Sequence, residues 1–504
     1  MMDLAVINGL VFIEGGFRKA DVGIKDGKFA LIAEPGCLPE AERTIDAGGK
    51  YVLPGGIDTH VHYRDPGHWE RETFEVGTRA AAAGGCTTFF EHPISMPPQW
   101  NGEILKNRIS ICKGEESAAN DRHEKGSCVD FCFFGAAGGE HPEAIEPLSH
   151  EGIIAYKTFL HEAPEGRDAE FEGLTSANND QLYRVLEEVK KTGLAVAAHA
   201  EDNELVTGFI KRLREQGRQT ENIAHCESRP PIVEIEAISK MLKFGKDVGC
   251  PIELVHVSTW QAMELAKKAK AEGQPVMVET CPHYLLLDES YVEKYGAYAK
   301  CNPALRKKED VERLWDYVKD GTVDFIGSDH SPFLVSEKEK KDKDGNKKMG
   351  IDENVRSSLT SCFYKMKFCP SEKNGNVDYE ELCKWLEDFK HLLKDQNQEY
   401  LYERLVGSLF ANAPVGNDGY PPHESVRKII EKYNSNDLNK SFIIAESNKR
   451  GVYSPDAGKS EKEIDFQKMG RFSSLSVPSA QKPDQKCGQC ASCTPGLFLL
   501  YFLM

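Results

Sequence analysis

The stretch from Tyr51 to Gly67 reads YVLPGGIDTHVHYRDPG and ends an apolar run with two histidines, an arginine and a turn. A β-strand sends alternate side chains to the same side, so His60, His62 and Arg64 would project together. Three polar side chains that converge on one point require a polar or charged partner.

Similar apolar runs recur along the chain and alternate with amphipathic segments. Helical periodicity marks the segments 179–193, 233–249, 260–273 and 309–321, several of which end in glycine. The apolar runs are residues 56–62, 86–92, 128–136, 152–160, 194–200, 252–258, 275–281 and 323–329. Eight β/α units predict an α/β fold, a (β/α)8 TIM-type barrel. An open doubly wound sheet is the rival, but no glycine-rich phosphate loop supports it.

Chemically active side chains fall at the carboxyl ends of these predicted strands, where barrel enzymes build their active sites. Any one of the histidines alone is more simply explained as a hydrogen-bonded core residue, but six groups at equivalent strand ends are hard to explain by packing. The six are His60, His62, Lys157, His199, His256 and Asp329.

Four neutral imidazoles and a carboxylate are ligands for Zn²⁺ or a similar divalent ion. Six ligands are too many for one tetrahedral site and suit two ions that share a bridge. Lys157 would repel the ions as an ammonium, whereas its N-carboxylated form is an anion that can bridge both. The alternative is a lysine that extends out of the barrel mouth.

With these residues, the chain resembles the cyclic amidohydrolases of the amidohydrolase superfamily, which include dihydroorotases, allantoinases and hydantoinases. The resemblance covers about residues 1–335 and is closest to allantoinase-like members. Its motifs are PGGIDTHVHYRDPG, GTRAAAAGGCTTFFEHPISMPP, GIIAYKTF, AHAEDNEL, ESRPPIVEIEAI, ELVHVST, ETCPHYLLLD, AKCNPALR and GSDHSP.

The resemblance implies a role for each ligand position. His60, His62 and Asp329 would bind one divalent ion, His199 and His256 the second, and carboxylated Lys157 would bridge them. A hydroxide activated by the two ions would open a cyclic amide, and Asp329 would be the catalytic residue that carries the proton to the leaving nitrogen.

The substrate depends on Arg64, which in dihydroorotases grips a carboxylate, and on Asn302, which the resemblance also places among substrate-binding residues. The stretch EHPISMPP lacks the asparagine that dihydroorotases carry there, so the sequence favours allantoin or a hydantoin-type ring. An ion pair from Arg64 to Asp65 or Glu70 is the structural alternative. Dihydroorotase activity, or a catalytically silent scaffold relative, are the alternative functions.

The charge composition of the chain indicates which classes of partner are improbable. Against 63 basic residues stand 80 acidic ones, a net charge of −17, which argues against nucleic-acid and anionic-membrane partners. The fifteen cysteines are mostly single, and neither a secretory signal nor a membrane span is evident, so we expect a cytoplasmic protein.

The expected organisation is an N-terminal β-module at 1–52, the barrel at 53–335 and an atypical C-terminal region at 336–504. That last region shows a charged run at 336–348, helix-like segments at 379–396 and 399–413, and three cysteines within 487–493. The return strands that would complete the β-module are not recognisable in it. An uncovered sheet edge favours a homo-oligomer.

Overall fold

The computed structural model describes residues 1–13, 15–117, 120–122, 125–164, 166–338, 372–373 and 376–377. The predicted helices at 379–396 and 399–413 and the cysteines at 487–493 lie outside the described residues, as does most of the charged run. The structure therefore describes the β-module and the barrel, which carry every predicted site residue.

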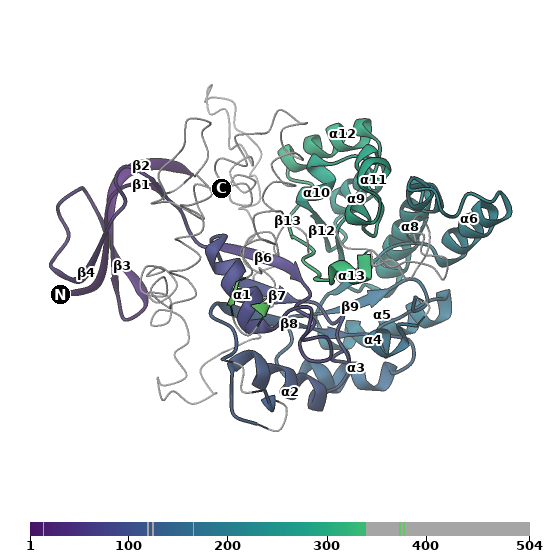
Figure 1. Cartoon of the computed structure of the whole chain (residues 1–504), viewed down its shortest axis with the longest axis horizontal. Coiled ribbons are helices and arrows are strands. Elements are labelled where there is room, and N and C mark those ends of the chain that lie inside the picture. Colours follow the sequence, from purple (N-terminus) through teal and green to yellow (C-terminus); the bar gives the residue numbers. More distant parts are fainter. Residues whose placement is uncertain are drawn as a thin grey trace.

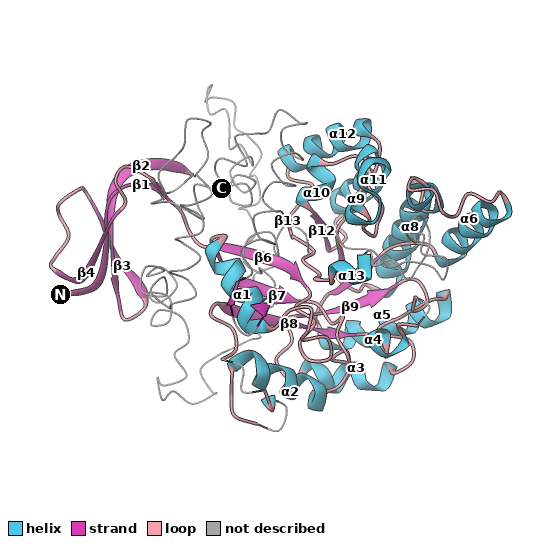
Figure 2. Ribbon diagram, in the orientation of Figure 1, coloured by secondary structure: helices cyan, strands magenta, loops and turns pink. Residues whose placement is uncertain are grey.

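Eight parallel strands form the central sheet, each beside its neighbour in sequence order. This confirms the predicted TIM-type barrel, and Figure 2 shows its strands in the middle of the molecule with helices outside them. The strands are β6 (Gly56–Val61), β7 (Cys86–Glu91), β8 (Asp130–Ala136), β9 (Ala155–Phe159), β10 (Val196–His199), β11 (Ile252–Leu254), β12 (Val276–Thr280) and β13 (Phe325–Ile326).

The first and last strands of this sheet meet through the segment that follows β13. A parallel bridge joins Val61 to His330, and the backbone N–H of His62 donates to the carbonyl of His330 at 2.6 Å. This closure brings residues about 270 positions apart to the same end of the barrel.

The helices of the outer layer follow the strands in the order expected for β/α units, and the four helices predicted within the barrel are present. None of the helices in the described part of the chain is long and apolar enough to cross a membrane. The helices are α1 (Phe74–Ala83), α2 (Gly102–Lys113), α3 (Pro142–Ser149), α4 (Asp168–Phe171), α5 (Asn179–Thr192), α6 (Asn203–Glu215), α7 (Ala224–Ser228), α8 (Pro231–Val248), α9 (Trp260–Ala271), α10 (Pro282–Leu286), α11 (Ser290–Tyr295), the 3₁₀ helix η2 (Gly296–Ala299), α12 (Lys308–Lys319) and α13 (Val335–Lys338).

Helix α5 illustrates how local sequence sets these boundaries. The Asn178 side chain accepts a hydrogen bond from the backbone N–H of Gln181 at 3.0 Å and so caps the first turn. Gly193 ends the helix in the left-handed conformation, with φ +74°. The buried residues Leu182, Val185, Leu186 and Val189 form one apolar stripe.

The N-terminal residues form a separate five-stranded sheet, which Figure 1 shows to one side of the barrel strands. Its strands are β1 (Met2–Ile13), β2 (Gly16–Lys25), β3 (Lys28–Ala33), β4 (Ala41–Asp46) and β5 (Tyr51–Val52). The path β3-β2-β1-β4 leaves β3 paired with β2 alone among the described strands. The predicted β-module is therefore present. Two further short strands, β14 (Glu372–Lys373) and β15 (Asn376–Val377), pair with each other.

Candidate metal centre

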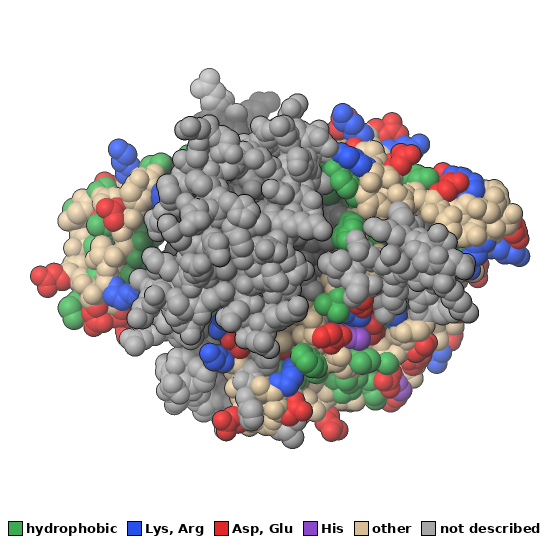
Figure 3. Space-filling model, in the orientation of Figure 1, with side chains coloured by type: hydrophobic (Ala, Val, Ile, Leu, Met, Phe, Trp, Pro, Cys, Tyr) green, Lys and Arg blue, Asp and Glu red, His purple; other side chains and the backbone are tan. Residues whose placement is uncertain are grey.

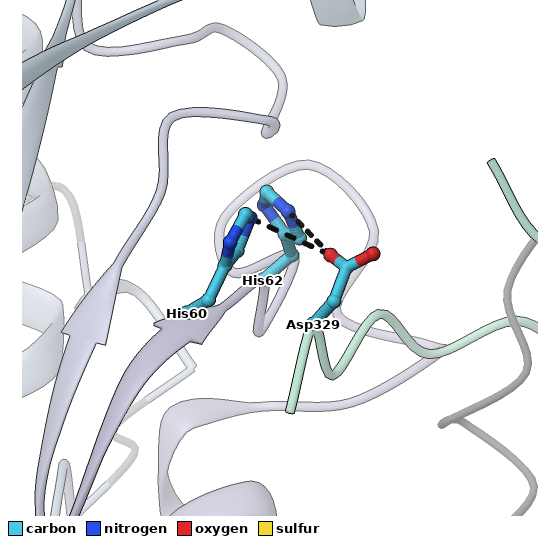
Figure 4. A group of neighbouring side chains, drawn as sticks. All are labelled: His60, His62 and Asp329. Carbon is cyan, nitrogen blue, oxygen red and sulfur yellow. Dashed lines mark ion pairs between the residues drawn. The ribbon is translucent and has the colours of Figure 1, made fainter. Parts of the chain in front are cut away.

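One group of potential ligands gathers where the barrel closes. The imidazole Nε2 of His60, at the end of β6, lies 3.5 Å from Oδ1 of Asp329, and Nε2 of His62 lies 3.3 Å from the same oxygen. These donor atoms all lie within 4.8 Å of one another. Figure 4 shows the two rings and the carboxylate facing a common point. Two imidazoles and a carboxylate in this arrangement suit a divalent ion.

A second group lies next to the first. Nδ1 of His199, at the end of β10, is 3.0 Å from Nε2 of His256, which follows β11. The ring centroids of His60 and His256 are 5.4 Å apart. All four predicted histidines are buried, and the structure brings them to one end of the barrel.

Hydrogen bonds orient three of these rings. In each, one ring nitrogen lies within hydrogen-bond distance of an oxygen. The tautomer with its proton on that nitrogen presents the lone pair of the opposite nitrogen to the site, as ligand imidazoles require. The pairs are His60 Nδ1 with Glu279 Oε1 at 2.7 Å, His62 Nδ1 with the carbonyl of His92 at 3.3 Å, and His199 Nε2 with Glu201 Oε2 at 2.9 Å. The opposite nitrogens of His60 and His62, both Nε2, face Asp329, and that of His199, Nδ1, faces His256.

Lys157 lies in β9, is fully buried, and pairs in register with Ala197 of β10. Its Nζ has no hydrogen-bond partner within the described part of the chain. Burial lowers the pKa of this amine to about 8, against the opposing effect of the Asp329 and Glu279 carboxylates. A buried amine without an acceptor is uncommon. The alternative to metal binding, a lysine that extends out of the barrel mouth, is not observed, because Lys157 is fully buried.

The backbone is strained at this end of the barrel. The left-handed region is costly for residues other than glycine, and His256 and Asp329 adopt it with φ +43° and +51°. Arg64 does so as well, with φ +62°. Strained conformations of this kind cluster at functional sites, where the surrounding structure maintains them.

Arg64 is buried and engaged with protein groups. Its Nη1 donates to the Ile94 carbonyl at 3.2 Å and lies 3.4 Å from Oε2 of Glu170. Its Nη2 donates to Ser331 Oγ, and the guanidinium lies over the Phe333 ring. Arg64 therefore forms an ion pair with a protein carboxylate, which is the structural alternative stated for it above.

The ion-pair partners predicted for Arg64 were wrong. Asp65 pairs with Arg122, and Glu70 pairs with His68 at 3.0 Å. The partner is Glu170, which lies 106 positions further along the chain, and no local pattern connects the two.

Asn302 precedes α12 and is partly buried. Its Oδ1 is shielded from solvent and has no hydrogen-bond partner among the residues described. An acceptor of this kind is free to receive an N–H from a bound molecule.

Sequence reasoning missed the groups that orient the ligands. Glu279 lies in β12, and its other oxygen accepts from Thr59 Oγ1 at 2.7 Å. The His92 ring stacks on His60, with centroids 3.7 Å apart. Both residues stand near strand ends, as the ligands do, and this shared position was the available signal.

The residues present fit a divalent ion. His60, His62 and Asp329 supply three ligand atoms within 4.8 Å of one another, as a divalent ion with one open position would require. The His199–His256 pair lies next to this group and offers further imidazole ligands.

Comparisons with known proteins show the family to which the chain belongs. Residues 51–386 match the sequence model described as the Amidohydrolase family. An allantoinase of Solibacter usitatus (strain Ellin6076) is 36% identical over 332 residues, which span 66% of this chain and 68% of that relative. An allantoinase of Bacillus velezensis is 37% identical over 331 residues, 66% of this chain and 69% of the relative.

Solved structures show the same similarity. An L-hydantoinase (dihydropyrimidinase) from Arthrobacter aurescens superposes with a TM-score of 0.62 and 29% identity, over 76% of this chain and 80% of that one. A D-hydantoinase superposes with a TM-score of 0.59 and 30% identity, over 72% and 77%.

Proposed function

Because this chain belongs to the amidohydrolase family, we propose that it is a metal-dependent hydrolase that opens a cyclic amide, with allantoin or a hydantoin-type ring as substrate. The observation that carries the proposal is the convergence of four buried histidines, Lys157 and Asp329 at one end of the barrel. A catalytically silent scaffold would have no need to keep every ligand position filled.

The proposed cofactor is a pair of Zn²⁺ ions. His60, His62 and Asp329 would hold one, and His199 and His256 the other. Lys157 would bridge them as its N-carboxylate, which gives the buried side chain the negative charge that the site requires. The ions supply an ionised water nucleophile and polarise the carbonyl that it attacks.

Asp329 performs the proton transfer in this scheme. Its carboxylate accepts a proton from the attacking water and delivers it to the ring nitrogen as the C–N bond breaks. The products are one carboxylate and one protonated nitrogen on an opened chain. An amide nitrogen leaves poorly without that proton, so we expect Asp329, which lies beside both histidines, to be essential to turnover.

The substrate assignment rests on the relatives and on Arg64. The curated relatives named above are allantoinases, and the solved structures are hydantoinases. Arg64 donates to Ile94, Glu170 and Ser331, so its guanidinium already has protein partners. A ring without a carboxylate needs no further partner from it. The dihydroorotase alternative requires Arg64 to exchange these contacts for substrate.

We therefore expect allantoin or hydantoin to be opened with a higher kcat/KM than dihydroorotate. Arg64→Ala should lower activity on all three rings by a similar factor, because the residue holds protein segments together. Steady-state rates for the three rings in the wild type and the variant test this expectation. A clear preference for dihydroorotate, lost selectively in Arg64→Ala, would instead assign the substrate carboxylate to Arg64.

The proposed domain division remains 1–52, 53–335 and 336–504, and we propose that the protein associates through the first of these. Among the described strands β3 pairs with β2 alone, and its Phe29, Leu31 and Ile32 are 75%, 39% and 47% exposed. Figure 3 shows hydrophobic side chains at the surface of this sheet. Unpaired edges with apolar side chains favour pairing with a second chain.

Ile32→Lys is expected to shift a homo-oligomer toward smaller species, because a charge on the edge strand opposes strand pairing. Ile232→Lys, at a residue of similar exposure (46%) on α8, is the matched control. Sedimentation velocity on the full chain measures the change. A monomeric wild type, or equal effects of the two substitutions, would exclude association through β3.

A further inference from the structure

His283 is a buried histidine that neither the proposed metal centre nor the proton transfer uses. It lies in α10, directly after β12, and is 4% exposed. Both of its ring nitrogens are shielded from solvent and have no hydrogen-bond partner within the described ranges. Buried polar atoms are nearly always satisfied by protein, water or ligand, so two orphaned nitrogens on one ring indicate a missing partner.

His283 lies at the same end of the barrel as the proposed metal centre. In the barrel sheet β12 lies between β11, which precedes His256, and β13, which precedes Asp329. His283 therefore follows the carboxyl end of β12, the end of the barrel at which His256 and Asp329 follow the two neighbouring strands. A neutral imidazole carries one N–H donor and one lone pair.

The adjacent residue connects His283 to Asn302. The ring of Tyr284 lies 4.2 Å from that of His283, centroid to centroid, and its hydroxyl donates to the carbonyl of Pro303 at 2.6 Å. Pro303 follows Asn302, whose Oδ1 is the orphaned acceptor described above. Two segments joined by the Tyr284–Pro303 hydrogen bond thus carry buried ring nitrogens and a buried amide oxygen that have no partner among the described residues.

We propose that His283 is a substrate-binding residue that, together with Asn302, hydrogen-bonds the ureide edge of the ring. A ureide places an N–H beside a carbonyl. The His283 N–H would donate to that carbonyl, and Asn302 Oδ1 would accept from the N–H. This assignment rests on the proposed function and makes His283 a determinant of specificity for rings that contain the –NH–CO–NH– group.

The test measures binding separately from turnover. In the zinc-loaded full chain carrying Asp329→Asn, titration calorimetry gives the affinity for hydantoin, with and without His283→Phe. We expect a loss of about 10- to 100-fold, because phenylalanine leaves the buried carbonyl of the ligand without its donor. His283→Gln, which retains a donor and an acceptor, should recover part of that affinity. Zinc content should stay unchanged in both.

Two controls make the outcome decisive. Should His283→Phe fail to fold, nitrogen-15 signals of the His283 ring in the Asp329→Asn protein, assigned by their absence in His283→Gln, should shift when hydantoin is added. Unmoved ring signals, or affinity within twofold of the parent in a folded His283→Phe, overturn the assignment. A wild type that opens a ring while His283→Phe keeps its kcat/KM overturns this inference alone. A wild type that neither binds nor opens any of the rings overturns the proposed function as well.

Discussion

Lys157→Ala should lose at least one of two bound divalent ions and, with it, all measurable ring opening. The residue is fully buried among groups that converge on the site, and its amine has no acceptor among the described residues. As an N-carboxylate it would supply the bridge between two ions, which alanine cannot replace. Elemental analysis of the purified variant measures the loss directly.

A surface lysine provides the control for this substitution. Lys246 pairs with Glu272 at 2.7 Å and is largely exposed, so Lys246→Ala should retain both ions. Wild-type protein prepared with carbon-13-labelled bicarbonate should also show a carbamate carbon that Lys157→Ala lacks. Two ions retained in folded Lys157→Ala would remove the bridging role.

Asp329→Asn should retain most of the metal yet lose turnover by about 10²- to 10⁴-fold, the usual contribution of a positioned proton carrier. Asparagine keeps an oxygen in place, but its amide cannot accept the proton of the attacking water. The variant therefore separates the ligand role of Asp329 from its proton-transfer role. Metal content and kcat for allantoin, measured on the same preparation, give both quantities.

Asp320→Asn is the matched control, since Asp320 pairs with Lys267 at 2.8 Å on the surface between α12 and β13. It should leave kcat unchanged. Substantial activity in a fully metal-loaded Asp329→Asn protein would transfer the proton step to another group.

The barrel and its polar ends could be predicted from the sequence because both leave local signals. Each strand is a short apolar run, and His60, His199 and Lys157 stand at or near the ends of such runs. Because all strands of a parallel barrel run in the same direction, residues at their carboxyl ends lie at the same end of the barrel. The helices were predictable for a similar reason, since Asn178 and Gly193 mark the two ends of α5 within its own sequence.

The groups that orient the ligands could not be predicted in this way, because their contacts cross the chain. Glu279 reaches His60 over 219 positions, and Arg64 reaches Ser331 over 267. Glutamates and serines occur throughout the sequence, and only the closed barrel selects which of them meet. His283 could not be singled out from the sequence either. Its residue type is compatible with a ligand or a core residue, and only the structure shows that its two ring nitrogens have no partner among the described residues.

The most direct test of a binuclear cyclic amidohydrolase is the rate of allantoin and hydantoin opening as Zn²⁺ is titrated into metal-free protein. Ring opening should be absent without metal and should rise to a maximum at about two equivalents of bound zinc per chain. Full activity in the metal-free protein, or no opening of either ring with two ions bound, would contradict the account.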